Sequence, residues 1–440
     1  MSLRRSPPLR LLILALVAGA VAGWGRANAE ALLLVEADTG KVLHAENATY
    51  PWYPASVTKL MTVYTTLRAV REGRITLDSL FPVSVNAAAQ SPTKMGFPVG
   101  TQVTVDNAIK MLMVKSANDM AVVLAEGVAG SIESFAAQMN ANAQALGMTQ
   151  TNYVNPNGLP ADEQITSARD LAILARALIR DFPEYDDYWH IASIRLGRRV
   201  YHNTNKLIDS YAGSDGMKTG FICASGFNLV ATATRDGRRL IAVVLGAPSA
   251  AVRAEKAARL LEQGFSSPPL SWLTPSLGLV NSLTPVDAAP ANLHEEMCGP
   301  HRKRPASEEE EEDNNAPADS PYSALLSSLK PQLPKGSLLQ QDANLGEPVV
   351  VFTGPARGQG PALAAIQAAP GKKSAAPKGA PTPAPTNPPV AANAVPWTSL
   401  SPGALAANPA AELGTAPPRA HVPLPRARPR LPSGGGEPPR

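Results

Sequence analysis

The sequence predicts an α/β fold. Two short apolar strands near the start, residues 31–36 and 41–44, are separated by Asp38-Thr39-Gly40, which is typical of a hairpin. Two further apolar strands rich in β-branched residues, 227–234 and 239–245, lie much later. The residues between these two pairs are mostly helical in pattern. Strands at both ends of a helical middle indicate one α/β unit whose sheet combines the first hairpin with the late strands.

The helices are predicted from apolar residues at spacings of three and four. They cover residues 56–71, 108–113, 118–128, 131–146, 167–179 and 253–265. Gly147 ends the fourth of them, and Ser167 with Asp170 resembles a capping box with Asp in place of Glu. Arg235-Asp236-Gly237-Arg238 is expected to form the tight turn between the two late strands.

Composition divides the 440 residues unevenly, because 32 of the 43 prolines lie at or beyond Pro268. A segment rich in Pro, Ala, Gly and Ser with few large apolar residues cannot offset the entropy of ordering itself. Residues 30–266 are therefore predicted to be the folded domain and residues 267–440 a mostly disordered Pro/Ala-rich tail. Within the tail, residues 322–354 contain enough apolar residues to hold a small ordered element.

Residues 1–29 are predicted to be a secretory signal peptide. Three arginines precede an apolar run that ends in small residues, Ala27-Asn28-Ala29. The run is shorter than the ~20 residues of a spanning helix, and an uncleaved anchor is the alternative. The signal carries four Arg and no acid, so its removal takes the net charge from +4 to zero. We therefore expect an exported protein of the periplasm or cell envelope, with no nucleic acid as partner.

Three short motifs occur in order: Ser56-Val57-Thr58-Lys59, Ser116-Ala117-Asn118 and Lys218-Thr219-Gly220. Each pattern alone is weak, because Ser91-Pro92-Thr93-Lys94 also fits the first and Ser84-Val85-Asn86 also fits the second. Helical context separates the two Ser-x-x-Lys matches. Ser56 is expected to open a helix, which places Lys59 one turn away on the same face, whereas Pro92 excludes a continuing helix at Ser91.

The first two motifs suit nucleophilic catalysis. A serine hydroxyl is a weak nucleophile near neutral pH and needs a base, and a buried lysine that has lost its proton can supply one. Ser56 and Lys59 are therefore predicted to be nucleophile and base. Ser116 is predicted to relay a proton to the leaving amine, and Asn118 to hold a substrate amide.

The third motif suits recognition of a free carboxylate. Lys218 and Thr219, expected on a strand edge, offer a cation and a hydroxyl. Gly220 is expected to leave room for the substrate backbone.

Together the three motifs form the signature of penicillin-binding proteins and class A β-lactamases. Segments around them also resemble the low-molecular-mass D-alanyl-D-alanine carboxypeptidases, namely Tyr53-Pro54-Ala55, Asn155-Pro156-Asn157-Gly158-Leu159, Asn203-Thr204-Asn205, Asp215-Gly216-Met217 and Ala224-Ser225-Gly226. The resemblance covers about residues 30–266. It implies a β-lactamase/transpeptidase-like fold, with an antiparallel sheet flanked by helices and an all-helical subdomain.

The resemblance also implies a serine-type carboxypeptidase that needs no cofactor. It would remove the terminal D-alanine from peptidoglycan stem pentapeptides through an acyl-enzyme on Ser56, and β-lactam antibiotics would acylate the same serine. The oxyanion hole would be the backbone N–H groups of Ser56 and Phe221. The β-sheet domain with a terminal amphipathic membrane helix that often follows is not recognisable in the Pro-rich tail, so membrane attachment stays open.

Three alternative functions are weighed against the carboxypeptidase. A class A β-lactamase carries a glutamate some thirty residues after the second motif, and residues 149–159 contain no acid. A D,D-endopeptidase acting on stem cross-links uses the same motifs and is not excluded. A non-catalytic scaffold that binds wall peptide has no need of Lys59 or Lys218.

The two cysteines, Cys223 and Cys298, lie on either side of the predicted domain boundary. Export permits a disulfide, and two thiols are the alternative that the sequence leaves open. His294, Cys298 and His301 are close enough in sequence to suggest a metal site, but a fourth ligand is missing and no metal is predicted.

Overall fold

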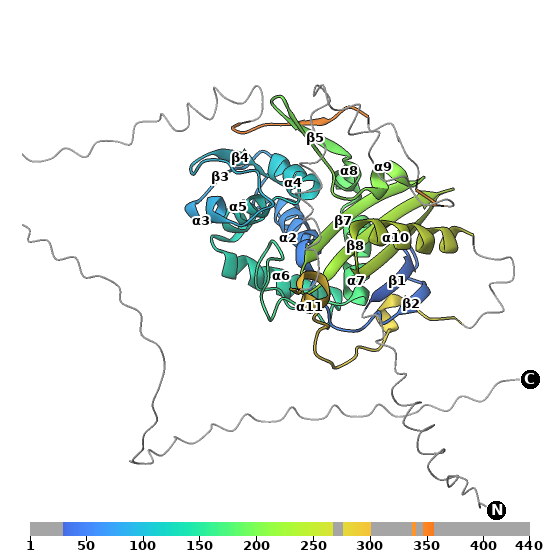
Figure 1. Ribbon diagram of the computed structural model, residues 1–440. Coiled ribbons are helices and arrows are strands. Elements are labelled where there is room, and N and C mark those ends of the chain that lie inside the picture. The colour runs from blue at the N-terminus through green and yellow to red at the C-terminus, as the bar shows by residue number, and fades with distance from the viewer. Residues whose placement is uncertain (1–29, 267–275, 301–336, 340–345, 356–440) are drawn as a thin grey trace, which may run out of the picture. The chain divides into compact units, whose positions relative to one another are not determined.

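The computed structural model describes residues 30–266, 276–300, 337–339 and 346–355. Its main sheet has five strands in the order β2-β1-β9-β8-β7, and all neighbouring strands are antiparallel. The strands are β1 (Ala31–Glu36), β2 (Val42–Glu46), β7 (Ser214–Ile222), β8 (Gly226–Arg235) and β9 (Arg238–Ala247). The first hairpin joins the late strands through β1 and β9, as the sequence predicts (Figure 1).

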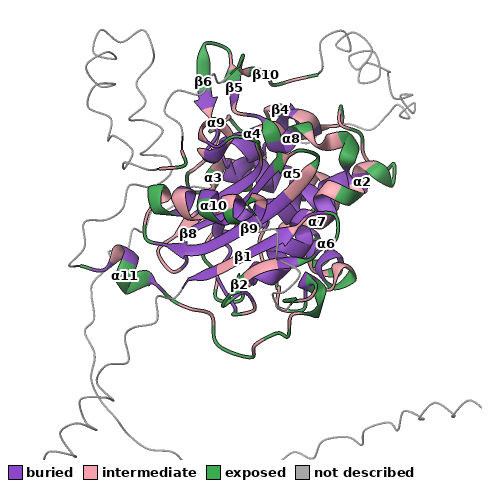
Figure 2. Cartoon of the chain, turned by 90° about the vertical axis from the view of Figure 1, so that its right-hand side faces the viewer, coloured by how far each residue is buried: buried purple, intermediate pink, exposed green. Residues whose placement is uncertain are grey.

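Alternate residues of the central strands face two separate cores, because side chains of a strand point to opposite faces of its sheet. Leu33 and Val35 belong to one core together with residues of α7 (Ala168–Asp181). Leu34 belongs to the other, together with residues of α10 (Ala250–Phe265). Figure 2 shows β8 and β9 buried along most of their length. The sheet is thus covered by helices on both faces.

The turn between β8 and β9 has the backbone that its sequence predicts. Asp236 and Gly237 have φ values of 50° and 74°. A two-residue hairpin turn of type I′ requires positive φ at both positions, which Asp and Gly tolerate.

The predicted helices are confirmed, with ends shifted by a few residues. They are η1 (Ala55–Thr58), α2 (Lys59–Arg71), α4 (Val105–Val114), α5 (Asn118–Ala129), α6 (Ile132–Leu146), α7 and α10. The side chains of Thr104, Ser131 and Ser249 accept hydrogen bonds from backbone N–H groups in the first turns of α4, α6 and α10. In α2, 10 of 13 residues are buried, so this helix is the centre of the helical region.

The predicted capping box at the start of α7 is only half correct. The Ser167 hydroxyl accepts from the Asp170 N–H at 3.2 Å. The carboxylate of Asp170, however, accepts from the Gln150 N–H at 2.8 Å and the Thr151 hydroxyl at 2.7 Å, and it pairs with Arg169 at 2.6 Å. Asp170 therefore ties the preceding loop to α7 instead of closing the cap.

Several short elements were not predicted individually, although one of them, the strand Val349–Val351, lies within the ordered element expected in residues 322–354. They are β3 (Leu80–Pro82), β4 (Gln102–Thr104), β5 (Ser193–Leu196), β6 (Arg199–His202), β10 (Val349–Val351), α3 (Val85–Ala89), α8 (Asp187–His190), α9 (Leu207–Ser210), α11 (His294–Cys298), η2 (Pro183–Tyr185) and η4 (Val280–Ser282). β3 pairs with β4, and a small sheet has the order β10-β5-β6. Strands of three or four residues leave little periodicity to detect.

Two parts of the expected tail pack onto the preceding domain. In the first, residues 276–300, the Gly278 carbonyl accepts from the Val42 N–H at 2.9 Å, and the Val280 N–H donates to Gly40 O at 2.8 Å. In the second, residues 346–355, β10 pairs in parallel with β5, and its Val351 is buried.

Apart from residues 337–339, where the Ser337 hydroxyl donates to Glu255 of α10 at 2.9 Å, the rest of the expected tail lies outside the described residues. The predicted signal peptide also lies outside them, so the division into three parts stays a prediction. In the part of the chain that the structure describes, no single helix has the length and apolar character to cross a membrane. Helices α5 and α6 meet that test only as a pair, with a bend of 85° between them.

Candidate active site

Ser56 and Lys59 are in direct contact at the start of the central helix. Ser56 lies in η1 and is partly exposed, whereas Lys59 begins α2 and is fully buried. Nζ of Lys59 lies 2.8 Å from Oγ of Ser56. The predicted spacing of one turn on a common face is confirmed.

The chain approaches Ser56 through a conformation that alanine rarely adopts. Ala55 has φ = 50°, in the left-handed region. Asn228 of β8 donates through Nδ2 to the carbonyls of Tyr53 and Pro54, at 3.0 and 3.1 Å. A Cβ on Gly158 would lie 1.9 Å from the Ala55 oxygen, so a neighbouring loop packs directly on this turn. Such strain persists where the surroundings fix it, and it concentrates at functional sites.

Two further oxygens surround the amine of Lys59. Oδ1 of Asn118 lies 2.7 Å from Nζ, and the backbone oxygen of Asn157 lies 2.6 Å from it. Asn157 belongs to the segment 155–159, which the sequence singles out only by its resemblance to the carboxypeptidases. Its contact with Lys59 was missed because a backbone carbonyl carries no side-chain signal, although the Asn-Pro-Asn-Gly pattern marks the loop.

Asn118 holds Lys59 and a neighbouring loop. Its Nδ2 donates to Ser91 O at 2.9 Å, and its backbone N–H donates to Thr93 O at 2.7 Å. The predicted contact with a substrate amide stays a prediction, since the observed partners of this side chain are protein groups.

The second Ser-x-x-Lys match, at Ser91, forms part of that loop. Residues 91–94 are not helical, as Pro92 predicts. Asp119 anchors the next residues by accepting from the N–H groups of Met95 and Gly96, at 3.1 and 2.9 Å. Burial raises the pKa of Asp119, against the lowering effect of these donors. The loop is therefore fixed against the start of α5.

Ser116 lies in the connection between α4 and α5 with φ = 60°. Its Oγ is buried and has no hydrogen-bond partner among the described residues. An unsatisfied buried hydroxyl costs about 1–3 kcal/mol. The stability of the fold therefore does not explain a serine at this position.

The third motif lies on β7, the strand at the edge of the sheet (Figure 1). This strand packs against η1. A Cβ on Gly220 would lie 2.7 Å from the backbone N of Ser56 and 3.0 Å from that of Val57. The close approach of the turn that carries Ser56 therefore requires a glycine here, and the expectation that Gly220 also leaves room for the substrate backbone stays a prediction.

The other members of the motif are buried beside that contact. Nζ of Lys218 lies 3.3 Å from Thr219 O, and Oγ1 of Thr219 lies 2.7 Å from Oγ1 of Thr204. Phe221 follows Gly220, and its ring lies 4.3 Å from that of Phe227 between centroids. The structure therefore brings residues of all three motifs into one neighbourhood around Ser56.

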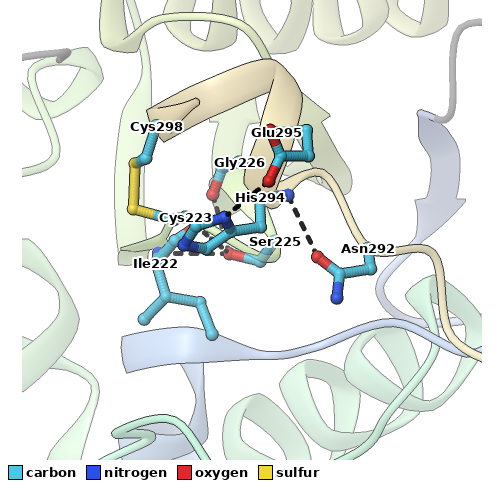
Figure 3. Close-up of a disulfide and its surroundings, with 8 residues drawn as sticks. All are labelled: Ile222, Cys223, Ser225, Gly226, Asn292, His294, Glu295 and Cys298. Atoms are coloured by element: carbon cyan, nitrogen blue, oxygen red, sulfur yellow. Dashed lines mark hydrogen bonds and ion pairs between the residues drawn. A yellow bond between two sulfur atoms is a disulfide. The ribbon is translucent and has the colours of Figure 1, made fainter. Parts of the chain in front are cut away.

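Cys223 and Cys298 form a disulfide next to this neighbourhood (Figure 3). The bond joins the turn after β7 to the last residue of α11, and the Leu293 N–H donates to Ala224 O at 2.9 Å beside it. Of the two alternatives that the sequence leaves open, the structure has the disulfide. It ties residues 276–300 to the strand that carries the third motif.

The same bond removes one ligand from the metal site considered above. The sulfur of Cys298 is bonded to Cys223, and His301 lies outside the described residues. Within the described ranges, no group of three or more His, Cys, Asp and Glu side chains is arranged to hold a metal.

Comparison with known proteins gives consistent results. E. coli D-alanyl-D-alanine carboxypeptidase DacC is 39% identical over 245 residues, which are 54% of this chain and 61% of that protein. The crystal structure of penicillin binding protein 6B from E. coli is 38% identical, with a TM-score of 0.51 over 54% of this chain and 76% of that one. A D-alanyl-D-alanine endopeptidase of Pseudomonas aeruginosa is 31% identical over 49% of this chain and 70% of its own length.

The chain spans about three fifths of the length of the curated carboxypeptidases it matches. Structural likeness supports the α/β fold with its antiparallel sheet and helices. The family model for peptidase family S11, D-alanyl-D-alanine carboxypeptidase, matches residues 20–249, which contain all three motifs. With that match and the geometry around Ser56, the chain belongs to the D-alanyl-D-alanine carboxypeptidase family.

Proposed function

We propose that this protein is a serine-type D-Ala-D-Ala carboxypeptidase that removes the terminal D-alanine from peptidoglycan stem pentapeptides. The observation that carries the proposal is the 2.8 Å contact between Oγ of Ser56 and Nζ of Lys59. A base within hydrogen-bond reach is what a serine nucleophile requires. Family membership supports the choice of substrate.

To act as a base, Lys59 must be a neutral amine. Such an amine has two N–H bonds and one lone pair. Asn118 Oδ1 and Asn157 O can accept the two N–H groups, which directs the lone pair at Ser56. Lys59 then takes the hydroxyl proton as Oγ of Ser56 bonds to the carbonyl carbon of the penultimate D-alanine.

Collapse of the tetrahedral intermediate needs a proton on the leaving amine. We assign this step to Ser116, whose buried hydroxyl has no partner among the described residues and can relay the proton from Lys59. The amide C–N bond breaks, D-alanine leaves, and an ester remains on Ser56. Water then attacks the ester, Lys59 takes a proton from it, and Ser56 recovers its hydroxyl proton.

Binding is assigned to β7 and η1. The backbone N–H groups of Ser56 and Phe221 are proposed to stabilise the oxyanion. Lys218 and Thr219 are proposed to bind the terminal carboxylate of the substrate. The same groups would hold a β-lactam, which would acylate Ser56.

The site is proposed to act outside the cytoplasm, in the periplasm or cell envelope. Family members act on the cell wall, and the Cys223–Cys298 disulfide is of the kind found in oxidising compartments. Residues 1–29 would direct the export.

A D,D-endopeptidase is the second candidate, favoured by the similarity to the P. aeruginosa endopeptidase. A defined pentapeptide and a cross-linked dimer distinguish the two, because the carboxypeptidase releases D-alanine from the former while the endopeptidase splits the latter. A penicillin distinguishes the other two alternatives. A β-lactamase would hydrolyse it rapidly, and a non-catalytic scaffold would not bind it covalently.

The test is D-alanine release from purified stem pentapeptide by the wild type, Ser56→Ala and Ser91→Ala. Ser91 belongs to the second Ser-x-x-Lys match and is the matched control. The proposal expects loss of activity in Ser56→Ala alone. Full activity of that variant, or none in the wild type, would exclude the carboxypeptidase.

A further inference from the structure

The Asn203-Thr204-Asn205 turn is built as a rigid support behind the third motif. Nδ2 of Asn203 donates to Ile191 O at 2.8 Å, and its Oδ1 accepts from the Asn205 N–H at 2.8 Å. Nδ2 of Asn205 donates to Gly216 O on β7 at 2.9 Å. Both asparagines are buried. Their amides therefore fix the backbone of the residue between them.

That residue, Thr204, connects two sides of the site. Its backbone N–H donates to the carbonyl of Val114, two residues before Ser116, at 3.4 Å. Its Oγ1 lies 2.7 Å from Oγ1 of Thr219, and both side chains are buried. Thr204 thus touches the end of α4 through its backbone and the third motif through its hydroxyl.

Binding of an anion by Thr219 would fix the direction of the hydrogen bond between the two hydroxyls. Each hydroxyl has one proton to donate. If Thr219 donates to a carboxylate, its oxygen must accept from Thr204, because the proton of Thr219 is already used. Donation by Thr204 also polarises the second hydroxyl and strengthens its bond to the anion.

We propose that Thr204 is a positioning residue for recognition of the substrate's terminal carboxylate. It acts by directing the Thr219 proton toward that group. This inference rests on the proposed function, in which Thr219 binds the carboxylate. Thr204 itself touches neither substrate nor the reacting atoms.

The experiment compares Thr204→Val, which keeps the shape and loses the hydroxyl, with Thr204→Ser, which keeps the hydroxyl. Thr232→Val is the matched control, since Thr232 is a buried threonine of β8 whose Oγ1 has no hydrogen-bond partner among the described residues. Each enzyme is assayed on a stem peptide ending in D-Ala-D-Ala and on its C-terminal amide. The ratio of the two kcat/KM values does not depend on how much of a variant is folded.

In Thr204→Val the preference for the free acid should fall about tenfold through a higher KM, with kcat nearly unchanged. Thr204→Ser and Thr232→Val should keep the wild-type ratio. An unchanged ratio in Thr204→Val, or an equal fall in Thr204→Ser, would contradict the positioning role of Thr204 and leave the proposed function standing. A wild type that releases no D-alanine would overturn the proposed function as well.

Discussion

Gly220 of β7 and Ser56 of η1 lie so close that a Cβ on the glycine would be 2.7 Å from the serine's backbone nitrogen. The edge strand β7 and the turn that carries Ser56 therefore touch through their backbones, with no room for a side chain between them. This contact sets the position of Ser56 relative to Lys218 and Thr219, since all three motif residues of β7 follow one another on a single strand.

Gly220→Ala should reduce acylation of Ser56 by a penicillin by about a hundredfold, because the clash is with backbone and displaces the nucleophile. The rate is measured with a fluorescent penicillin under single-turnover conditions. Gly197→Ala is the control: at φ = 60° it strains its own turn, but its Cβ meets nothing within 4 Å, so it should acylate like the wild type. A Gly220→Ala enzyme of normal rate would contradict the contact.

Ser116→Ala should lower the activity of the enzyme without lowering its stability. D-alanine release should fall by about 10²–10⁴ if the hydroxyl relays the proton, while the free energy of unfolding should be unchanged or slightly higher, since no hydrogen bond of Oγ is lost. Urea denaturation and product assays measure the two effects. Ser225→Ala is the contrast: Ser225 Oγ donates to Gly226 O at 2.8 Å, so its loss should cost about 1 kcal/mol. A clear loss of stability in Ser116→Ala would show that its hydroxyl has a structural partner.

The Cys223–Cys298 disulfide joins two residues that are 75 positions apart in the sequence. Its reduction should lower the free energy of unfolding by about 2–4 kcal/mol, because the unfolded chain gains freedom. Thermal melting with and without dithiothreitol measures this effect in the wild type. The Cys223→Ala/Cys298→Ala double variant should melt early in both conditions, and a wild type insensitive to the reductant would contradict the prediction.

Asp209 should contribute more to the stability of the protein at low pH than at neutral pH. Burial raises its pKa to about 6, partly offset by the attraction of Lys206. The folded state then holds a proton more tightly than the unfolded state, so the contribution of this group to stability is greatest below about pH 4 and falls until about pH 6. Because Asp209 is partly exposed, solvent screening reduces the effect to about 1 kcal/mol.

The variant Asp209→Asn should accordingly be more stable than the wild type at pH 7.5 and equal to it below about pH 4. Urea denaturation at both pH values measures the difference. Asp162→Asn removes the same charge from an exposed loop and should change little at either pH. A destabilised Asp209→Asn at pH 7.5 would show that the ionised carboxylate is favourable in the fold.

Local signals predicted much of this fold. Ser131 and Ser167 mark helix starts, and Gly147 ends α6 with φ = 78°. Asp236-Gly237 predicted the hairpin that aligns β8 with β9. These features depend on residues close in sequence, whose chemistry restricts the backbone directly.

The contacts that were missed join distant segments. Residues 276–300 return to the β1–β2 hairpin through backbone hydrogen bonds of Gly278 and Val280, which do not depend on the side chains. The Asn157 carbonyl beside Lys59 and the parallel pairing of β10 with β5 are likewise backbone contacts. The close approach of the Ser56 turn to Gly220 was also missed, because a sequence does not show which segment packs against a glycine.

The central claim is that Ser56, with Lys59 as its base, forms the covalent intermediate. Peptide mapping by mass spectrometry after incubation with a penicillin tests it most directly. We expect a stable adduct on the peptide that contains Ser56, unchanged in Ser91→Ala and absent from Lys59→Met. An adduct on the Ser91 peptide, or none on the wild-type protein, would contradict the account.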